Sequence, residues 1–371
     1  MDFTLTSAQE DLGALSRQIL TDRVTLERLR EIEAGETRFD PAVWSDLATA
    51  GVLAAALPEA VGGAGLGLLE QCSVLIEVGR TVAPIPYLAS IVLGASAVAT
   101  FGSPRQRERW LAPAATGELI LAAAMAEEDG DDARRPATTA DRSGEGWVLT
   151  GTKTTVLAGA IADLVLVSAS TPDGPAVFAV APSDPGVTVR PQDVTGGDAT
   201  AVVELSRALV PDDQVLGDVG AGPQIIGWVI DRATVGLCAL QLGVTERALE
   251  LTAAYARSRE QFGKPIGSFQ AVSQRLADGY IDVEGVRLSL WQAAWLLAEG
   301  RASETEIATA KFWAAEAGHR VAHSAVHIHG GVGIDMDGDI HRYFAAAKHN
   351  EFALGGATAQ LRRIGAVLAS S

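Results

Sequence analysis

Cysteines, long apolar runs and targeting segments are scarce or missing in this chain. Only two of its 371 residues are cysteines, Cys72 and Cys238, and they lie far apart without C-x-x-C spacing. This scarcity excludes a disulfide scaffold and a cysteine-ligated metal site, and it is typical of a reduced, cytoplasmic protein. No charge-free apolar run reaches the roughly 18 residues of a membrane span, so we expect none. The first residues, MDFTLTSAQEDLGAL, lack the basic and apolar segments of a secretory signal, and none is expected.

Positive charge is also in short supply. The chain has 29 Lys and Arg residues against 46 Asp and Glu residues, which gives a formal net charge of −17. Because no basic stripe is present, we expect no nucleic-acid-binding surface. The negative charge would repel an anionic ligand such as a CoA ester at long range, so any binding of one must rest on local contacts. The simplest interpretation of the acidity itself is solubility.

Hydrophobic residues, in contrast, are plentiful. They make up 48% of the chain and are spread along its length, which suits a globular protein of two or three domains. Residues 1–120 have helical periodicity, and a capping-box pattern at Ser7 and Glu10 predicts where the first helix begins. A later helix in this part is predicted to have Ser103 as its cap and Pro104 as its first residue.

The period changes to that of short strands over residues 121–220. The runs GWVLTGTK, DLVLVSAS, PAVFAVAP, GVTVRP and TAVVELSRALV are rich in β-formers and are separated by Gly, Pro and Asp. This pattern is typical of an antiparallel barrel or sandwich. Helical periodicity then returns, with helices predicted at 224–257, 268–299, 304–329 and 339–369. The chain thus predicts an α+β fold with three domains: helical (1–120), antiparallel β (121–220) and a helical bundle (221–371).

Three conspicuous motifs are better explained by structure than by ligand binding. His319, His323 and His327 recur every four residues on one predicted helix face, but no carboxylate completes an H-E-x-x-H spacing, so we expect no metal. The glycine-rich AVGGAGLG at 60–67 lacks the strand-loop-helix context of a nucleotide fingerprint, and we interpret it as an interhelix loop. The acidic AEEDGDD at 126–132 is interpreted as a solvated loop and less readily as a cation site.

Two other motifs favour a large anionic ligand. ARSREQFGKPIGSFQAV at 256–272 places two arginines and a Phe-Gly turn between helices. Arginine can hold a pyrophosphate bidentately, and phenylalanine can cover an adenine or ribose, although an ordinary turn has the same composition. HIHGGVG at 327–333 is a glycine-rich turn at a helix end, where a phosphate can approach the backbone closely. Together the two motifs strengthen the case for a cofactor.

Over essentially its full length the chain resembles the acyl-CoA dehydrogenases. The resemblance is carried by RSREQFGKPIGSFQAV, HIHGGVGID, HRYFAAAKHNEFALGG and PEAVGGAGLGLLE, and also by GWVLTGTK and ELSRALVPDDQVLG. It implies an N-terminal helical domain, a central β domain and a C-terminal four-helix bundle. It also implies dimers or dimers of dimers, with FAD lying across a subunit interface.

The resemblance implies a reaction for which this chain has no base. The family removes the α-proton and a β-hydride from an acyl-CoA thioester, and a glutamate takes the proton. The two positions from which the family supplies that glutamate are Leu354 and Ala233 here, and neither can accept a proton. Glu351 and Asp231 lie nearby in sequence, but the displacement along the chain works against either as a substitute. We therefore expect no catalytic residue in this chain.

Positions that resemble the flavin-ring contacts of the family are altered as well. Ala126 replaces a threonine, Thr155 replaces a tryptophan, Leu157 replaces a second threonine, and Gly356 replaces a third. The resemblance implies that each of these changes removes a contact to the isoalloxazine or the pyrophosphate. The half of the site that holds the flavin ring within one subunit is therefore expected to be degraded.

The residues that reach across to the neighbour's FAD in the family are largely kept. Two of them depart from the usual type, because Gln261 replaces a small hydroxyl residue and His327 replaces a glutamine. The expected cofactor-binding residues are Arg259, Gln261, Phe262, Gln270, His327, Gly330 and Gly331.

This lopsided pattern predicts a non-catalytic, FAD-sharing subunit. It resembles the base-lacking beta subunits of actinobacterial heterotetrameric acyl-CoA dehydrogenases, which act on CoA esters of steroid side chains. The resemblance implies a catalytic alpha subunit that supplies the glutamate and binds most of the acyl-CoA, with electron-transfer flavoprotein as the acceptor. Two alternatives stay open from the residues alone. One is a self-sufficient flavoenzyme with an unusual base, and the other is a purely structural paralogue.

Overall fold

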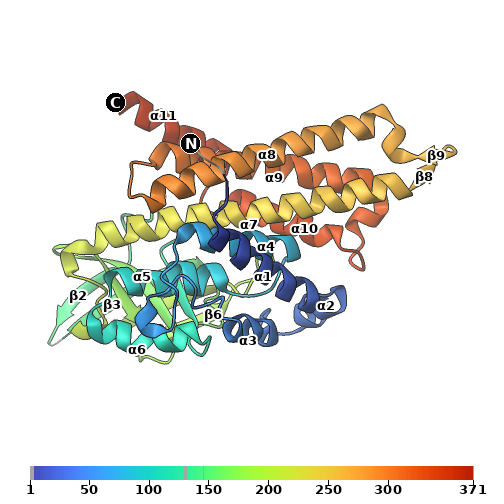
Figure 1. The fold of residues 1–371 in the computed structure, drawn as a ribbon. Coiled ribbons are helices and arrows are strands. Elements are labelled where there is room, and N and C mark those ends of the chain that lie inside the picture. The colour runs from blue at the N-terminus through green and yellow to red at the C-terminus, as the bar shows by residue number, and fades with distance from the viewer. Residues whose placement is uncertain (1–3, 129–131, 145, 371) are drawn as a thin grey trace.

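The structure is a computed structural model that describes residues 4–128, 132–144 and 146–370. Its elements follow the predicted order of helices, strands and helices, so the α+β class is confirmed (Figure 1). Residues 129–131 of the acidic AEEDGDD segment lie outside the described residues, as does residue 145. The domain borders at 120/121 and 220/221 remain predictions.

The first helical part carries its predicted start signals with one correction. Its helices are α1 (Ser7–Arg23), α2 (Leu26–Ala34), α3 (Pro41–Thr49), α4 (Leu68–Thr81), η2 (Tyr87–Ala95), α5 (Ser96–Phe101) and α6 (Pro104–Ala115). The capping box of α1 is formed by Thr6 and Gln9, one residue before the predicted pair, because Thr6 has the extended backbone of a cap. Ser103 caps α6 before Pro104, as predicted.

The strands form one seven-stranded sheet that is not wholly antiparallel. They are β1 (Leu121–Ala124), β2 (Thr139–Ser143), β3 (Gly146–Val156), β4 (Leu164–Thr171), β5 (Gly174–Val180), β6 (Val187–Pro191) and β7 (Ala201–Pro211). The order is β1-β4-β2-β3-β7-β6, with β5 on the free side of β4. The purely antiparallel prediction is wrong at β4, which pairs in parallel with β1 and with β2. Crossover segments rather than hairpins join these strands, and the local strand pattern does not reveal that difference.

The C-terminal helices are α7 (Gly222–Ser258), α8 (Gln270–Ala298), α9 (Glu304–His329), α10 (Ile340–Phe352) and α11 (Ala357–Ser370). The predicted single helix over 339–369 is therefore two helices. The break lies at Leu354 and Gly355, whose φ angles of 58° and 90° are left-handed and cannot continue an α-helix. The glycine signal was present in the sequence, but the left-handed leucine before it was not foreseeable.

Helix α7 is the central helix of the molecule and is packed closely against α4. A Cβ atom added at Gly79 would lie 2.1 Å from the carbonyl oxygen of Leu240, and one at Gly243 would lie 1.9 Å from that of Ile76. The two helices cross backbone to backbone because glycine is present on both. Among the described residues, one stretch, Val219–Ser258, has the length and apolar composition to cross a membrane, but 67% of its apolar window is buried inside the protein.

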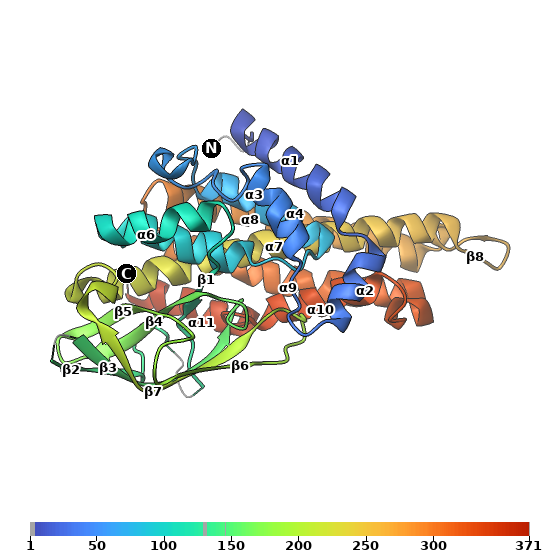
Figure 2. The same cartoon turned by 90° about the horizontal axis from the view of Figure 1, so that it is seen from below.

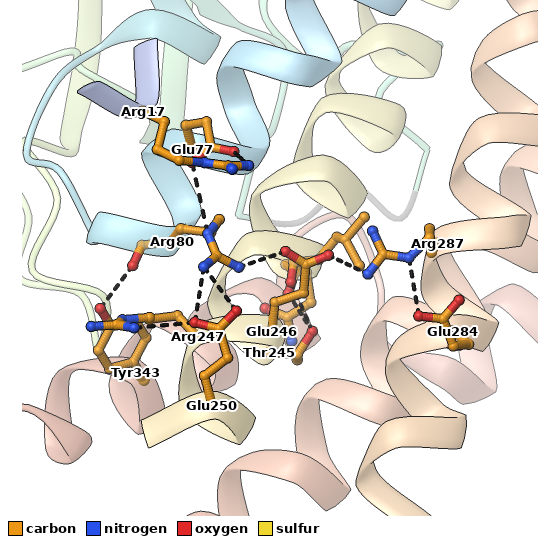
Figure 3. Close-up of polar contacts among 12 residues, drawn as sticks. Arg17, Glu77, Arg80, Thr245, Glu246, Arg247, Glu250, Glu284, Arg287 and Tyr343 are labelled. Carbon is orange, nitrogen blue, oxygen red and sulfur yellow. Dashed lines mark hydrogen bonds and ion pairs between the residues drawn. The ribbon is translucent and has the colours of Figure 1, made fainter. Parts of the chain in front are cut away.

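Charged side chains join the two helical parts around Arg80 of α4 (Figure 3). Its guanidinium lies 2.9 Å from Glu246 and 2.9 Å from Glu250, both on α7. Glu246 also pairs with Arg287 of α8 at 2.6 Å, and the Tyr343 hydroxyl of α10 donates to the Arg80 carbonyl. Each charge is balanced by a partner, so we interpret this network as a structural junction.

Candidate functional site

The predicted arginine motif forms a projecting hairpin at the end of α7. Strands β8 (Glu260–Gln261) and β9 (Lys264–Pro265) pair around Phe262 and Gly263, whose φ angles of 54° and 77° are both left-handed. Two successive left-handed residues are typical of the type I′ turn that closes tight hairpins. The hairpin extends beyond the ends of the long helices, away from the sheet (Figures 1 and 2).

The glycine-rich turn lies at the same end of the bundle. Tyr255, one turn before Arg259, stacks on His329 with ring centroids 4.3 Å apart, which brings the ends of α7 and α9 together. Gly330 follows with φ 65° and caps α9. A Cβ added at Gly330 or Gly331 would meet nothing within 4 Å. Backbone conformation, rather than a neighbouring group, therefore favours glycine at position 330, and the space above both glycines is open to a ligand.

All the expected cofactor-binding residues are solvent-exposed, including Gln261, Gln270 and His327. The Phe262 side chain is 93% exposed at the tip of the hairpin, where it contacts only Phe269 edge-to-face. Arg259 contributes its backbone to the hairpin, and no partner for its guanidinium is found in the described part of the chain. An exposed aromatic ring beside an unpaired guanidinium suits an aromatic, anionic ligand held by a second chain.

The first vacant base position lies in the sharp turn between α10 and α11. The turn is held by two side chains: Gln360 donates to the carbonyls of Leu354 and Gly355, and buried Lys311 donates to those of Asn350 and Glu351. The Leu354 side chain is 46% exposed. The turn is thus rigidly built, but it presents an aliphatic group that cannot take a proton.

The second vacant position, Ala233, is buried on α7 and equally inert. Two residues earlier, Asp231 lies 3.6 Å from Arg134 and 3.6 Å from Arg363. Burial raises the pKa of Asp231, although the two arginines oppose the shift. Its Oδ1 atom is buried without a hydrogen-bond partner among the described residues. Asp231 is therefore the carboxylate near this position that has the properties of a general base.

Glu351, the other proposed substitute, is occupied elsewhere. Its carboxylate lies 2.5 Å from the Lys348 ammonium and 3.3 Å from the His319 ring. These contacts tie it to the surface between α9 and α10. His323 stacks on His319, and the three histidines of this helix gather no third acidic or metal-binding group among the residues that the structure describes.

The altered flavin-ring positions have made other contacts. The backbone N–H of Thr155 donates to the Gln192 side chain at 2.9 Å, and the Ala126 carbonyl accepts from Thr154. Leu157 lines a cavity of about 430 Å³ that also reaches α7 at Leu237. A hydroxyl is missing at Ala126, Leu157 and Gly356, so the side chains present fit a flavin ring poorly. The exposed residues at the far end of the bundle fit the adenosine and pyrophosphate of FAD better.

Sequence reasoning missed a buried ion pair beside these positions. Lys153 of β3 is fully buried, and its ammonium lies 2.7 Å from Glu127 and 3.0 Å from the Ser168 hydroxyl. Glu127 also accepts from the backbone of Ala137 and from Thr138, and these contacts lower its pKa to about 2. The acidic segment was interpreted as a solvated loop, but Glu127 itself is structural. The lysine in the strand run GWVLTGTK was the available signal.

Known proteins define the class to which this fold and site belong. Residues 6–118, 122–208 and 220–369 match the models of the N-terminal, middle and C-terminal domains of the acyl-CoA dehydrogenases. The chain therefore belongs to the acyl-CoA dehydrogenase family, whose members are flavin-dependent oxidoreductases of lipid metabolism, and this membership implies FAD as cofactor.

Particular relatives narrow the comparison further. The chain is 50% identical to acyl-CoA dehydrogenase FadE27 of Mycobacterium tuberculosis over all of both chains. It is 51% identical, with a TM-score of 0.96 over all of both chains, to a chain in the crystal structure of the ChsE4-ChsE5 complex from the same organism. It is 43% identical, with a TM-score of 0.91 over 98% of each chain, to a chain of the Tcur3481-Tcur3483 steroid dehydrogenase.

Proposed function

We propose that this chain is the non-catalytic, FAD-sharing subunit of a heteromeric acyl-CoA dehydrogenase. The assembly removes hydrogen from Cα and Cβ of a CoA thioester that carries a sterol side chain. A catalytic alpha subunit supplies the glutamate, and two subunits of each kind form the heterotetramer. Bound FAD would accept the hydride, and electron-transfer flavoprotein would then take the electrons. We place the assembly in the cytoplasm.

The observation that carries this proposal is the asymmetry of the site. Both base positions, Leu354 and Ala233, are aliphatic, whereas the projecting hairpin with Arg259 and Phe262 is exposed and has no ligand to bind within its own chain. Loss of a general base alone lowers the rate by roughly 10²–10⁴-fold. An exposed phosphate-binding arm is useful only if another subunit supplies the rest of the site.

Two relatives support the heteromeric assembly and the substrate. One is a chain of a complex named for two different proteins, and the other is named a steroid dehydrogenase with two gene products. Identities of 51% and 43% over nearly the whole chain are high enough for the interface to be retained. The acyl pocket is assigned mainly to the alpha subunit, since the present chain has no group to react there.

The visible spectrum of the purified chain tests the proposal directly. We expect the chain to be colourless alone and to give a yellow, active complex after co-expression with its alpha subunit, at one FAD per pair of subunits. The measurement is absorbance near the flavin band together with acyl-CoA-dependent bleaching. A yellow chain that acyl-CoA bleaches without a partner would overturn the proposal.

Arg259→Ala tests the donated half of the site. We expect this change to lower FAD retention of the complex by roughly tenfold or more, because it removes a bidentate, charge-assisted contact to phosphate. The measurement is the FAD content after gel filtration at matched protein concentration. Arg257→Ala is the matched control, since Arg257 is equally exposed two residues earlier and is not expected to contact the cofactor. Unchanged FAD content in the Arg259 variant would instead favour a purely structural subunit.

A self-sufficient flavoenzyme is the second candidate function, and one observation favours it. Asp231 is half-buried beside the vacant Ala233, and its pKa is raised as a general base requires. If Asp231 were the base, the chain alone would be yellow, and Asp231→Asn would abolish bleaching by acyl-CoA without loss of bound FAD. Under the subunit proposal, Asp231→Asn leaves turnover of the complex within about twofold of the unaltered complex.

A further inference from the structure

A cavity of about 430 Å³ lies between α2, α4, α7 and α10, where the sheet loop before β7 closes its floor. Most of its wall is apolar and comes from distant parts of the chain: Leu29, Phe39, Leu88, Leu157, Leu237 and Leu240. A cavity of this volume with an apolar wall and a few polar groups has the properties of a small-molecule site. Neither vacant base position lines it.

Arg38 is the exceptional group in this wall. It is half-buried in the loop between α2 and α3, and its φ of 51° is left-handed. In the described part of the chain, no carboxylate lies within 4.0 Å of its guanidinium and no hydrogen bond to it is found. One of its terminal nitrogens lies beside Gly197, where an added Cβ would come within 3.2 Å of it. An uncompensated cation beside an apolar wall is unfavourable unless an anion joins it.

The other charged groups of the wall are already paired. Arg342 is held bidentately by Glu33, and Asp198 lies 3.7 Å from the His349 ring. His341 adds a neutral polar group, because burial lowers its pKa, and its Nδ1 atom is buried without a hydrogen-bond partner among the described residues. The cavity therefore has one cation and one imidazole nitrogen free to bind a ligand.

We infer that this cavity binds an apolar carboxylic acid, with the carboxylate on Arg38 and the hydrophobic body against the leucine-rich wall. The guanidinium can hold both oxygens of a carboxylate in parallel hydrogen bonds. A thioester of the same acid has no negative charge at its acyl carbon, so Arg38 selects the free acid over its CoA ester. The site requires neither flavin nor a partner subunit, and it is therefore independent of the proposed function.

Fluorescence titration of the full-length chain with cis-parinaric acid tests the inference. We expect saturable binding at one site per chain and the same site in the complex. In Arg38→Leu, affinity for the acid should fall by roughly tenfold or more, since a charge-assisted bidentate contact is lost. Affinity for the corresponding alcohol, cis-parinaryl alcohol, should be the same in both proteins, because the alcohol is uncharged.

Arg207→Leu is a matched control for this titration. Arg207 is also left-handed, with φ 58°, and it also lacks an ion pair among the described residues, but it lies on β7 outside the cavity. It should bind the acid as the unaltered chain does. Ala346→Trp, which fills the cavity from α10, should abolish binding of both acid and alcohol.

Two results would overturn the inference. One is the absence of saturable binding to a chain whose circular dichroism shows it to be folded. The other is equal affinity of the acid for the unaltered chain and for a folded Arg38→Leu variant. Both outcomes are read from ligand fluorescence and remain distinct from the flavin absorbance that tests the shared FAD site. If Ala346→Trp fails to fold, the comparison of Arg38→Leu with Arg207→Leu still decides.

Discussion

Replacing Lys153 by methionine is expected to lower the free energy of unfolding by about 3–5 kcal/mol. Lys153 has no exposed surface, and the side chain of its partner Glu127 is only 8% exposed. Removing the ammonium leaves a carboxylate buried without its counter-charge, which is the unfavourable half of a buried ion pair. The measurement is urea unfolding at pH 7, together with the thermal midpoint of the variant.

The double variant Glu127→Gln with Lys153→Met separates charge from packing. It should recover most of the lost stability, because no buried charge then remains unpaired. Arg142→Met is the control, since Arg142 and its partner Asp212 are each about half exposed, and the loss there should stay below about 1 kcal/mol. A loss as small as this control in the Lys153 variant would contradict the prediction.

The same pair sets a sign for the acid dependence. The contacts of Glu127 hold its pKa near 2 in the folded chain, below the value of about 4.3 for an unfolded glutamate. Its contribution to stability is therefore complete above about pH 4.5 and is lost as the pH falls toward 2.

The second large effect is expected on the alkaline side and comes from Lys311. This lysine is buried in α9, and burial lowers its pKa to about 8, against about 10.4 in an unfolded chain. A lowered lysine pKa means that the charged form destabilises the fold. The penalty is complete below about pH 8 and is relieved as the pH rises toward 10.4. The folded chain should gain on the order of 3 kcal/mol from this group over that window.

Lys311→Met provides the reference for this measurement. Urea unfolding of both proteins from pH 7.5 to 10.5 gives the difference in stability, which cancels the titration of tyrosines and other lysines common to both. The unaltered chain should gain on the variant as the pH rises. Parallel curves would mean that Lys311 titrates normally, and that its bonds to the carbonyls of Asn350 and Glu351 already compensate its burial.

The sequence was informative where the chemistry is local. Helix starts, the hairpin residues around Phe262 and the glycine turn at Gly330 are short patterns whose conformation depends on neighbours within a few residues. Misplacement of the first capping box by one residue is the scale of error expected at helix ends. The missing bases at Leu354 and Ala233 were also visible, since a side chain that cannot accept a proton needs no structure to exclude it.

Longer-range features could not be predicted in this way. The parallel pairing of β4 with β1 joins residues 43 apart, such as Leu121 and Leu164, and the strand period is the same in either direction. The ion pair of Lys153 with Glu127 was missed because an acidic run is usually solvated. A lysine in the apolar helix segment IATAKFWAA was a signal for buried Lys311, but its carbonyl partners lie on another helix.

By itself, then, the sequence determined the family pattern, the order of helices and strands, and the chemical vacancy at both base positions. These depend on residue identity and on short spacing, both of which are present in the unfolded chain. Only the tertiary structure decided which charges are balanced. It paired Arg80, Arg342 and Lys153 with carboxylates from distant segments, and it left Arg38 without one beside an apolar cavity. Charge compensation is a property of distance in space, and the chain acquires it only on folding.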